Sequence, residues 1–310
     1  MLRCVAAMKM SKSARADLAL LFITLVWGST FVIVKRSLAQ VSPILFLAMR
    51  FWLATFVILV FMPTAMRHMS LRTFKRGFVL SVYLLGGFLF QTLGLRGTTP
   101  SRSAFITSLA VLLVPLLGFL IFRYRPRLRT LAGVVMATVG LGLLTLNTLE
   151  LNLRYGDVLT LICAGVFALH ILFIGRYTPT TDYRQLVTLQ VGLSAVVCTL
   201  IMPVLEMPFL VWDATLTLYL LVTGILATAL AFYLQNWAQQ FTTPNRTALI
   251  FSLEPFAAAL FAYLLMGSSL TPREWIGGGL VLGGILTSEL RRGGGPWPPC
   301  LRDQGSGTAG

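Results

Sequence analysis

A lone carboxylate, Glu254, interrupts a long apolar stretch in the last quarter of the chain, and Pro255 follows it directly. An ionised carboxylate in such a stretch is costly unless it is paired, hydrated or protonated. The proline lacks an N–H group and clashes with the carbonyl four residues earlier, which predicts a kink with an exposed carbonyl. Two interpretations stay open. Glu254 couples proton movement or binds an amine, or it is locked to Arg50, Arg246 or nearby backbone as part of the fold.

A cation and an imidazole also fall inside apolar runs. Arg50 can bind a carboxylate through two parallel hydrogen bonds, or it can be an internally paired or snorkelling side chain. His170 is a candidate proton carrier because histidine titrates near neutral pH, with a packing role as the alternative. Lys35, near the end of a run, is interpreted as an interfacial anchor or a gate residue.

Polar and small residues recur at helical spacing in two further runs. The first comprises Thr217, Gly224, Thr228, Gln235 and Gln239, and the second comprises Tyr83, Gly87, Gln91 and Gly94. Steps of three, four and seven place such residues on one face of a helix, where they line a hydrated path or pack on another helix. Aromatic side chains are expected to join them as a lining or as an interfacial belt. Together with Glu254, the predicted pathway residues are Trp27, Arg50, Tyr83, Gln91, His170, Thr228, Tyr233, Gln235, Asn236 and Trp237.

Small residues elsewhere are assigned to packing rather than binding. They are the glycines of 130–148 and 273–290 and the row Ala248, Ser252 and Ala259. Small side chains let neighbouring helices approach closely.

Enzymatic chemistry finds little support in the sequence. There are two histidines and four cysteines without metal-ligand spacing, and the sequence has neither a nucleophile elbow nor a phosphate-binding loop. We therefore expect no catalytic residue, metal or cofactor. An intramembrane enzyme and a channel-like facilitator remain the alternatives, and nothing resembles a selectivity filter.

The elements that must position these groups are membrane-spanning helices. The chain is 56% hydrophobic and only 11% charged, whereas soluble domains carry about 25% charged residues. Runs long enough to cross a bilayer, about 20 residues each, predict an all-α integral membrane protein with ten spans. The expected spans are 18–36, 43–63, 76–95, 103–122, 130–148, 157–175, 186–205, 214–236, 246–266 and 273–290.

The net charge of +15 is distributed unevenly around these spans. With the amino terminus inside, 18 of the 25 Lys and Arg residues fall on the cytoplasmic side, as the positive-inside rule requires. The charge thus predicts a multi-pass protein of the cell inner membrane with both termini cytoplasmic. The basic residues lie between apolar runs rather than on one polar face, which argues against nucleic-acid binding.

Two halves of the chain resemble each other. Thr98-Thr99-Pro100-Ser101-Arg102-Ser103-Ala104 returns 144 residues later as Thr242-Thr243-Pro244-Asn245-Arg246-Thr247-Ala248, and Asp17 and Arg50 match Asp157 and Gln190 at a spacing of 140. A unit of five spans is odd in number, so the second copy must enter the membrane inverted. Inverted repeats are typical of alternating-access carriers with a site between the halves.

Several motifs support a family resemblance. They are Trp27-Gly28-Ser29-Thr30-Phe31, Met49-Arg50-Phe51, Ala104 through Pro115, Leu253-Glu254-Pro255-Phe256, and the Gly-rich run from Trp275 to Gly284. In their order and duplication the chain resembles EamA-type permeases of the drug/metabolite transporter superfamily. The resemblance implies ten helices and export of small metabolites, commonly amino acids or related compounds, with the lipid bilayer and a small molecule as partners. His170 departs from the aromatic or small residue expected there. The sequence does not indicate an oligomeric state.

The domain boundaries follow from the repeat. We expect a cytoplasmic tail over 1–16, a first five-helix repeat over 17–148, a second over 157–291, and a disordered tail over 292–310.

Overall fold

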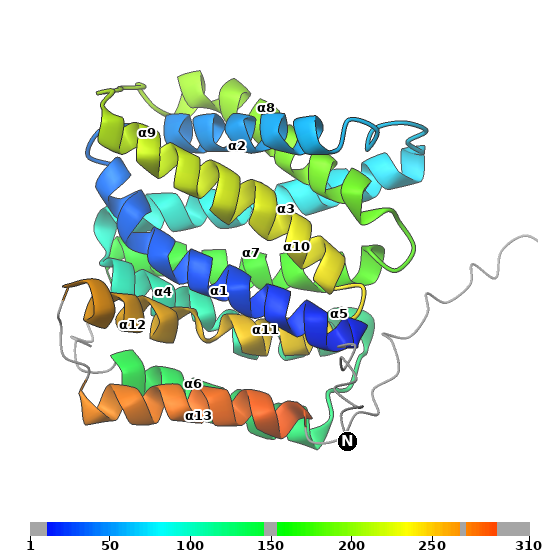
Figure 1. Ribbon diagram of the computed structural model, residues 1–310, viewed down its shortest axis with the longest axis vertical. Helices are drawn as coiled ribbons and strands as arrows, with labels where there is room; N and C mark the ends of the chain where they lie inside the picture. Colours follow the sequence, from blue (N-terminus) through cyan, green and yellow to red (C-terminus); the bar gives the residue numbers. More distant parts are fainter. Residues whose placement is uncertain (1–10, 146–153, 267–270, 290–310) are drawn as a thin grey trace, which may run out of the picture.

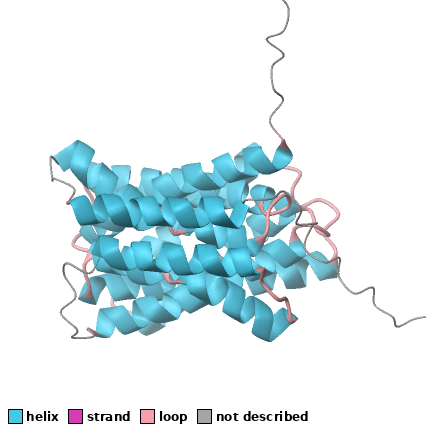
Figure 2. Ribbon diagram, turned by 90° about the horizontal axis from the view of Figure 1, so that it is seen from below, coloured by secondary structure: helices cyan, strands magenta, loops and turns pink. Residues whose placement is uncertain are grey.

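The computed structural model describes residues 11–145, 154–266 and 271–289, and the helices in these ranges run side by side with their loops gathered at two ends (Figures 1 and 2). No named β-strand occurs in these ranges. The elements are α1 (Lys12–Ser37), α2 (Pro43–Phe61), α3 (Leu71–Gly97), α4 (Pro100–Ser108), α5 (Ala110–Phe122), α6 (Leu128–Thr145), α7 (Tyr155–Tyr177), α8 (Tyr183–Leu205), α9 (Ala214–Leu221), the π-helical η2 (Val222–Leu230), α10 (Ala231–Ala238), α11 (Pro244–Phe251), α12 (Glu254–Met266) and α13 (Pro272–Glu289).

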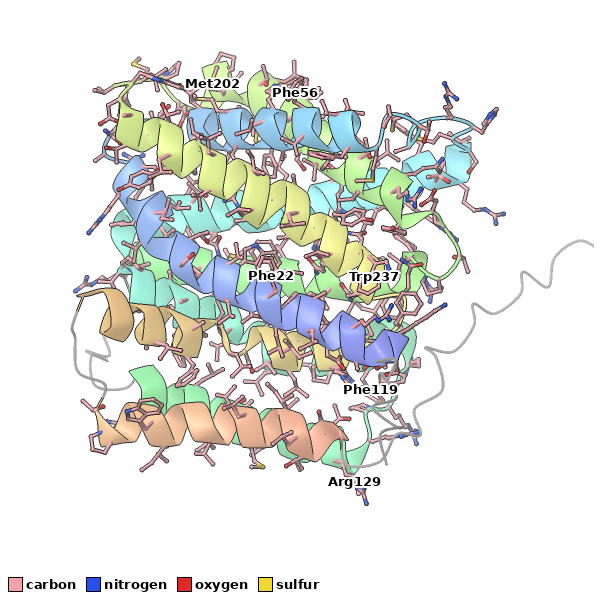
Figure 3. All side chains as sticks on the ribbon, in the orientation of Figure 1. Phe22, Phe56, Phe119, Arg129, Met202 and Trp237 are labelled. Atoms are coloured by element: carbon pink, nitrogen blue, oxygen red, sulfur yellow. The ribbon has the colours of Figure 1, made fainter. Side chains whose placement is uncertain are left out.

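The helices confirm an all-helical protein with many apolar spans. Seven segments are long and apolar enough to cross a membrane, with α4–α5 and α9–η2–α10 each counted as one, and Leu128–Leu143 and Trp275–Ser288 are shorter apolar helices. The remaining expected span, 246–266, corresponds to α11 and α12. Large apolar side chains such as Phe56, 65% exposed, cover the outside of the bundle (Figure 3). Exposed apolar surface of this extent is stable only against lipid.

The predicted terminal tails lie mostly outside the described residues. Residues 1–10 and 290–310 are not described, and α1 already begins at Lys12, inside the stretch expected as a tail. Ser11 caps this helix by accepting a hydrogen bond from the Ala14 amide at 3.2 Å. This helix therefore starts six residues before the span that hydropathy suggests, because a cap rather than an apolar residue sets its first turn.

The repeated Thr-Thr-Pro motif is a helix-start signal in both halves. Thr99 caps α4 and Thr243 caps α11, each accepting a hydrogen bond at 3.3 Å from the amide three residues later. Proline follows at the first helical position, where its missing N–H costs nothing. The motif thus recurs because both copies begin a helix in the same way.

Two spans are broken near their middle at corresponding positions. The α4–α5 span is interrupted by a turn at Leu109, and the α11–α12 span is interrupted by a turn at Ser252 and Leu253. Pro255 cannot donate to the carbonyl of Phe251, so the interruption falls where the sequence predicts a kink. These breaks bring irregular backbone to the interior of the bundle, where buried protein surroundings tolerate it.

The most extensive packing joins the two halves of the chain rather than helices of one half. The main pairs are α6 with α13, α3 with α7 and α2 with α8, and the first pair lies at one edge of the bundle in Figure 1. Glycines make the α6–α13 contact close, as predicted: a Cβ at Gly140 would lie 2.5 Å from the carbonyl oxygen of Gly277. Neither half therefore has a core of its own.

Candidate functional site

A cavity with an empty volume of about 670 Å³, including the part open to solvent, lies between the helices. Its walls are mostly aromatic and aliphatic with a few polar groups, as is usual for small-molecule sites. The lining residues are Trp27, Thr30, Phe31, Arg50, Phe88, Gln91, Thr107, Ser108, Ala110, Val111, Phe167, His170, Ile171, Phe232, Gln235, Ala248, Phe251, Ser252 and Glu254.

Arg50 projects from α2 into this cavity and is 2% exposed. Its Nε donates a hydrogen bond to Thr228 Oγ1 at 2.6 Å, and one terminal nitrogen donates to the carbonyl of Ala227 at 3.3 Å. The guanidinium lies over the Phe88 ring, 4.3 Å from its centroid, in a cation–π arrangement. The cation is thus held by neutral groups of α3 and η2.

Glu254 occupies the break between α11 and α12 and is 8% exposed. Its backbone carbonyl packs on Gly28, where a Cβ would lie 2.8 Å away, so the glycine lets α1 approach this break. Neither suggested ion pair forms among the described residues: Arg246 pairs with Asp17, and Arg50 bonds to Thr228. No hydrogen bond to the Glu254 carboxylate occurs within the described ranges. The carboxylate therefore faces the cavity without a protein counter-ion there.

His170 lies in the same wall and is bound to a glutamine. Its Nε2 is 2.7 Å from Gln190 Oε1, and its ring meets Phe232 edge to face with centroids 5.7 Å apart. Gln190 is fully buried, and its Nε2 has no hydrogen-bond partner among the residues that the structure describes. The imidazole is thereby oriented by a neutral amide and not by a carboxylate.

Lining residues from the two halves correspond to one another. At spacings of 140 and 144 residues they occupy matched positions, in α1, α3, α4 and α5 of the first half and in α7, α10, α11, α12 and the turn between α11 and α12 of the second half. The pairs are Trp27 with Phe167, Thr30 with His170, Phe31 with Ile171, Phe88 with Phe232, Gln91 with Gln235, Thr107 with Phe251, Ser108 with Ser252 and Ala110 with Glu254. Arg50, His170 and Glu254 have no charged or titratable counterpart in the other half.

Six predicted pathway residues line the cavity, and five lie elsewhere. The six are Trp27, Arg50, Gln91, His170, Gln235 and Glu254. Of the others, Tyr83 stacks on Phe173, Thr228 binds Arg50, Tyr233 pairs with the Tyr183 hydroxyl at 3.2 Å, Asn236 donates to the Phe232 carbonyl, and Trp237 packs edge to face on Phe241. The stripe from Thr217 to Gln239 brings one member, Gln235, to the cavity, because η2 winds more widely than an α-helix and turns Gly224 and Thr228 toward α2.

Two residues assigned to packing line the cavity instead. Ala248 and Ser252 were grouped with Ala259 as a packing row, but the break after Phe251 turns the end of α11 toward the interior. For Ser252, the match with Ser108, which also lines the cavity, was a signal available in the sequence. The lining by Phe88, Phe167 and Phe232 was missed because phenylalanine is common throughout such a chain.

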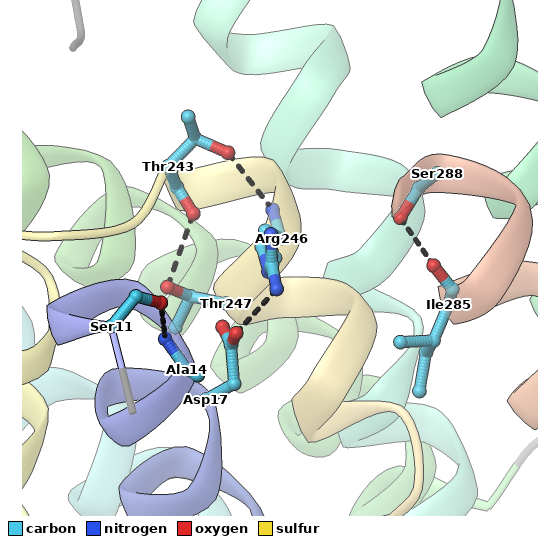
Figure 4. Close-up of polar contacts among 8 residues, drawn as sticks. All are labelled: Ser11, Ala14, Asp17, Thr243, Arg246, Thr247, Ile285 and Ser288. Atoms are coloured by element: carbon cyan, nitrogen blue, oxygen red, sulfur yellow. Dashed lines mark hydrogen bonds and ion pairs between the residues drawn. The ribbon is translucent and has the colours of Figure 1, made fainter. Parts of the chain in front are cut away.

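An ion pair between the halves lies near each end of the bundle. Asp17 of α1 binds Arg246 of α11 (Figure 4), and Asp157 of α7 binds Arg102 of α4 at 2.7 Å. The two pairs use corresponding residues, since Asp157 and Arg246 follow Asp17 and Arg102 by 140 and 144 residues. Asp157 also accepts hydrogen bonds from Thr98 Oγ1 at 2.6 Å and from the Arg154 amide at 2.9 Å.

These pairs lie at opposite ends of the bundle. Asp17 is near the start of α1, whereas Lys35 near its end donates to the carbonyls of Leu95 and Thr98, and Thr98 binds Asp157. Lys35 therefore holds the carboxyl end of α3, where a cation is favoured.

Comparison with known proteins agrees with this geometry. The model of the EamA-like transporter family matches residues 14–146 and again residues 154–289. The chain belongs to the EamA-like transporter family. An uncharacterized transporter of Archaeoglobus fulgidus is 33% identical to this EamA protein over 90% of the chain and 87% of its own length. A protein of Salmonella typhimurium described as a probable amino-acid metabolite efflux pump is 26% identical over 86% of the chain and 91% of its own length.

A solved crystal structure shares the fold of this EamA protein. Its TM-score is 0.73 at 18% identity, and the match covers 89% of this chain and 96% of that one. Family and relatives confirm the resemblance recognised in the sequence. This EamA protein is a multi-pass membrane transporter of small metabolites rather than an enzyme, and its partners are a small-molecule substrate and the lipid bilayer.

Proposed function

We propose that this protein exports amino acids or related small metabolites across the cell inner membrane by alternating access. In this proposal ten membrane helices form two inverted five-helix repeats, 17–148 and 157–291, with the tails 1–16 and 292–310 on the cytoplasmic side. The matched lining of the cavity carries the proposal, because both halves contribute corresponding residues to one site. A site shared in this way can be exposed to either side when the halves exchange conformations.

The chemistry of the cavity supports an amino acid as the solute. Arg50 and Glu254 supply one group of each charge, and six aromatic rings provide an apolar surface for a side chain. The relative described as a probable amino-acid metabolite efflux pump points to the same class of solute. Glu254 is the proposed partner of the substrate ammonium group.

The ion pairs at the two ends support alternation. Opening one end requires separation of the halves there, which breaks Asp17–Arg246 at one end or Asp157–Arg102 at the other. The intact pair then keeps the opposite end closed. Proton exchange is proposed at Glu254, since a carboxylate that gains a proton inside a membrane loses its charge and the cost of burying it.

Flux measurements in proteoliposomes test this function. Purified protein is given a panel of amino acids, sugars and organic cations, with and without a pH gradient. Saturable flux of amino acids, inhibited by one another, is the expected result. Flux that does not saturate would indicate a channel-like facilitator, and chemical change of the solute would indicate an enzyme. Saturable flux that does not depend on the pH gradient would contradict proton coupling but not the carrier function.

A further inference from the structure

A nine-residue π-helical segment, η2, separates α9 from α10 beside Arg50. π-helical turns are rare and frequently occur at functional sites. Within η2 the Thr228 hydroxyl donates to the carbonyl of Thr223 at 2.7 Å. The hydroxyl proton of Thr228 is therefore used within η2, and the hydroxyl oxygen accepts a hydrogen bond from another donor.

Arg50 is that donor, and η2 supplies two acceptors to it. Nε of Arg50 bonds to Thr228 Oγ1 at 2.6 Å, and a terminal nitrogen bonds to the Ala227 carbonyl at 3.3 Å. The same carbonyl accepts the indole N–H of Trp27 at 2.9 Å. Gly224 lets η2 come this close, because a Cβ there would lie 2.8 Å from Leu53 and 3.3 Å from the Arg50 carbonyl oxygen.

These contacts occupy the edge of the guanidinium formed by Nε and one terminal nitrogen. They do not use the edge formed by the two terminal nitrogens. Nε and one terminal nitrogen are occupied, and Phe88 covers a face of the group. The second terminal nitrogen has no hydrogen bond to any described residue, and the side chain lines the cavity. The edge formed by the two terminal nitrogens matches a carboxylate in planar geometry, with two parallel hydrogen bonds.

We infer that η2 is a device that positions Arg50, and that the remaining edge of Arg50 receives the carboxylate of the transported solute. Thr228 is thus a positioning residue that acts through Arg50. A carboxylate fits better than a phosphate dianion, because Glu254 in the same cavity adds a negative charge that one arginine would have to balance as well. In the other half the corresponding residue is Gln190, so the solute carboxylate has one binding position and the solute one orientation.

The inference rests on the proposed function and is tested by the preference for an acid over its amide. The probes are L-phenylalanine and L-leucine, whose side chains suit the aromatic and aliphatic walls, together with the amide of each. Flux of the acids gives KM in proteoliposomes, and inhibition by the amides gives their apparent affinity. The amides keep the ammonium group and the side chain but lack the anion.

Thr228→Val removes the hydroxyl at nearly constant volume, and Thr228→Ser retains it. Thr228→Val is expected to raise KM for the acids about tenfold, the effect of one lost hydrogen bond to a charged group, while amide affinity stays within twofold. Thr228→Ser is expected to restore the wild-type preference. Arg50→Lys keeps the charge without the planar fork and is expected to lose the preference as well.

The outcomes separate the two proposals. Wild-type protein that carries neither acid contradicts the proposed function and this inference with it. Wild-type flux together with an unchanged acid-to-amide preference in Thr228→Val and Arg50→Lys overturns the inference alone. Equal losses for acid and amide in Thr228→Val, without rescue by Thr228→Ser, also overturn it, since they indicate a general packing role.

Discussion

Glu254 stands where three features of the chain meet: the break between α11 and α12, the close approach of Gly28, and the cavity. A buried carboxylate without a protein counter-ion is a costly arrangement to retain for packing alone. Its position in the first turn of α12 offsets part of this cost, because the amino end of a helix favours negative charge. A solute ammonium group or a proton bound at Glu254 offsets the rest of this cost, because either one neutralises the buried carboxylate.

Replacing Glu254 by glutamine therefore separates a role of this carboxylate in transport from a role in the fold. Glu254→Gln is expected to abolish amino-acid flux, by at least about a hundredfold, because the amide can neither exchange a proton nor pair with an ammonium group. The yield of folded protein, measured by size-exclusion chromatography, should stay unchanged, since no cation in the described part of the chain loses its partner. Glu254→Asp serves as the control that keeps the charge. Wild-type flux in Glu254→Gln would rule out the functional role.

At the scale of elements, the α6–α13 pair depends on small residues at fixed positions. A Cβ at Gly140 would lie 2.5 Å from the Gly277 carbonyl oxygen and 2.9 Å from the Val281 nitrogen, and both are backbone atoms that cannot turn aside. Substitution must therefore push the two helices apart.

Gly140→Ala is expected to lower the free energy of unfolding by about 1–3 kcal/mol through overpacking, although alanine is the better helix former. Gly165→Ala in α7 is the matched control, because nothing lies within 4 Å of the added methyl group. That variant should keep or gain stability, by up to about 1 kcal/mol. Thermal unfolding in detergent measures both. Equal changes in stability for Gly140→Ala and Gly165→Ala would contradict close packing at Gly140.

Across the whole molecule, the two ion pairs mark the ends that alternating access must open. A bifunctional thiol reagent across Asp17→Cys and Arg246→Cys, or across Asp157→Cys and Arg102→Cys, is expected to stop flux in a background without native cysteines. Each cross-link holds one end closed, and a carrier needs both ends to open in turn. The uncross-linked double variants, assayed for flux in parallel, are the controls. Undiminished flux with a complete cross-link at either end would contradict alternation.

Several properties were fixed by the sequence alone. Apolar runs of about 20 residues predicted membrane helices, since the bilayer thickness sets their length. The Thr-Thr-Pro repeat and the matches around it indicated two related halves, and the same family model now matches each half. Glu254 and Arg50 could be selected as site candidates because charge inside an apolar run is costly wherever the helices pack. Both prove to line the cavity.

The tertiary structure decided which polar residues share the cavity. A stripe drawn at 3.6 residues per turn placed Gly224 and Thr228 on one face, and Thr228 was predicted to line the pathway, but the wide turn of η2 directs both residues to α2. Likewise, the break after Phe251 brings Ser252 to the site instead of a packing surface. Helical periodicity describes one regular helix. Where a helix widens or stops, the direction of each side chain is set by contacts between segments distant in sequence, such as Arg50 with Thr228 and Gly28 with Glu254.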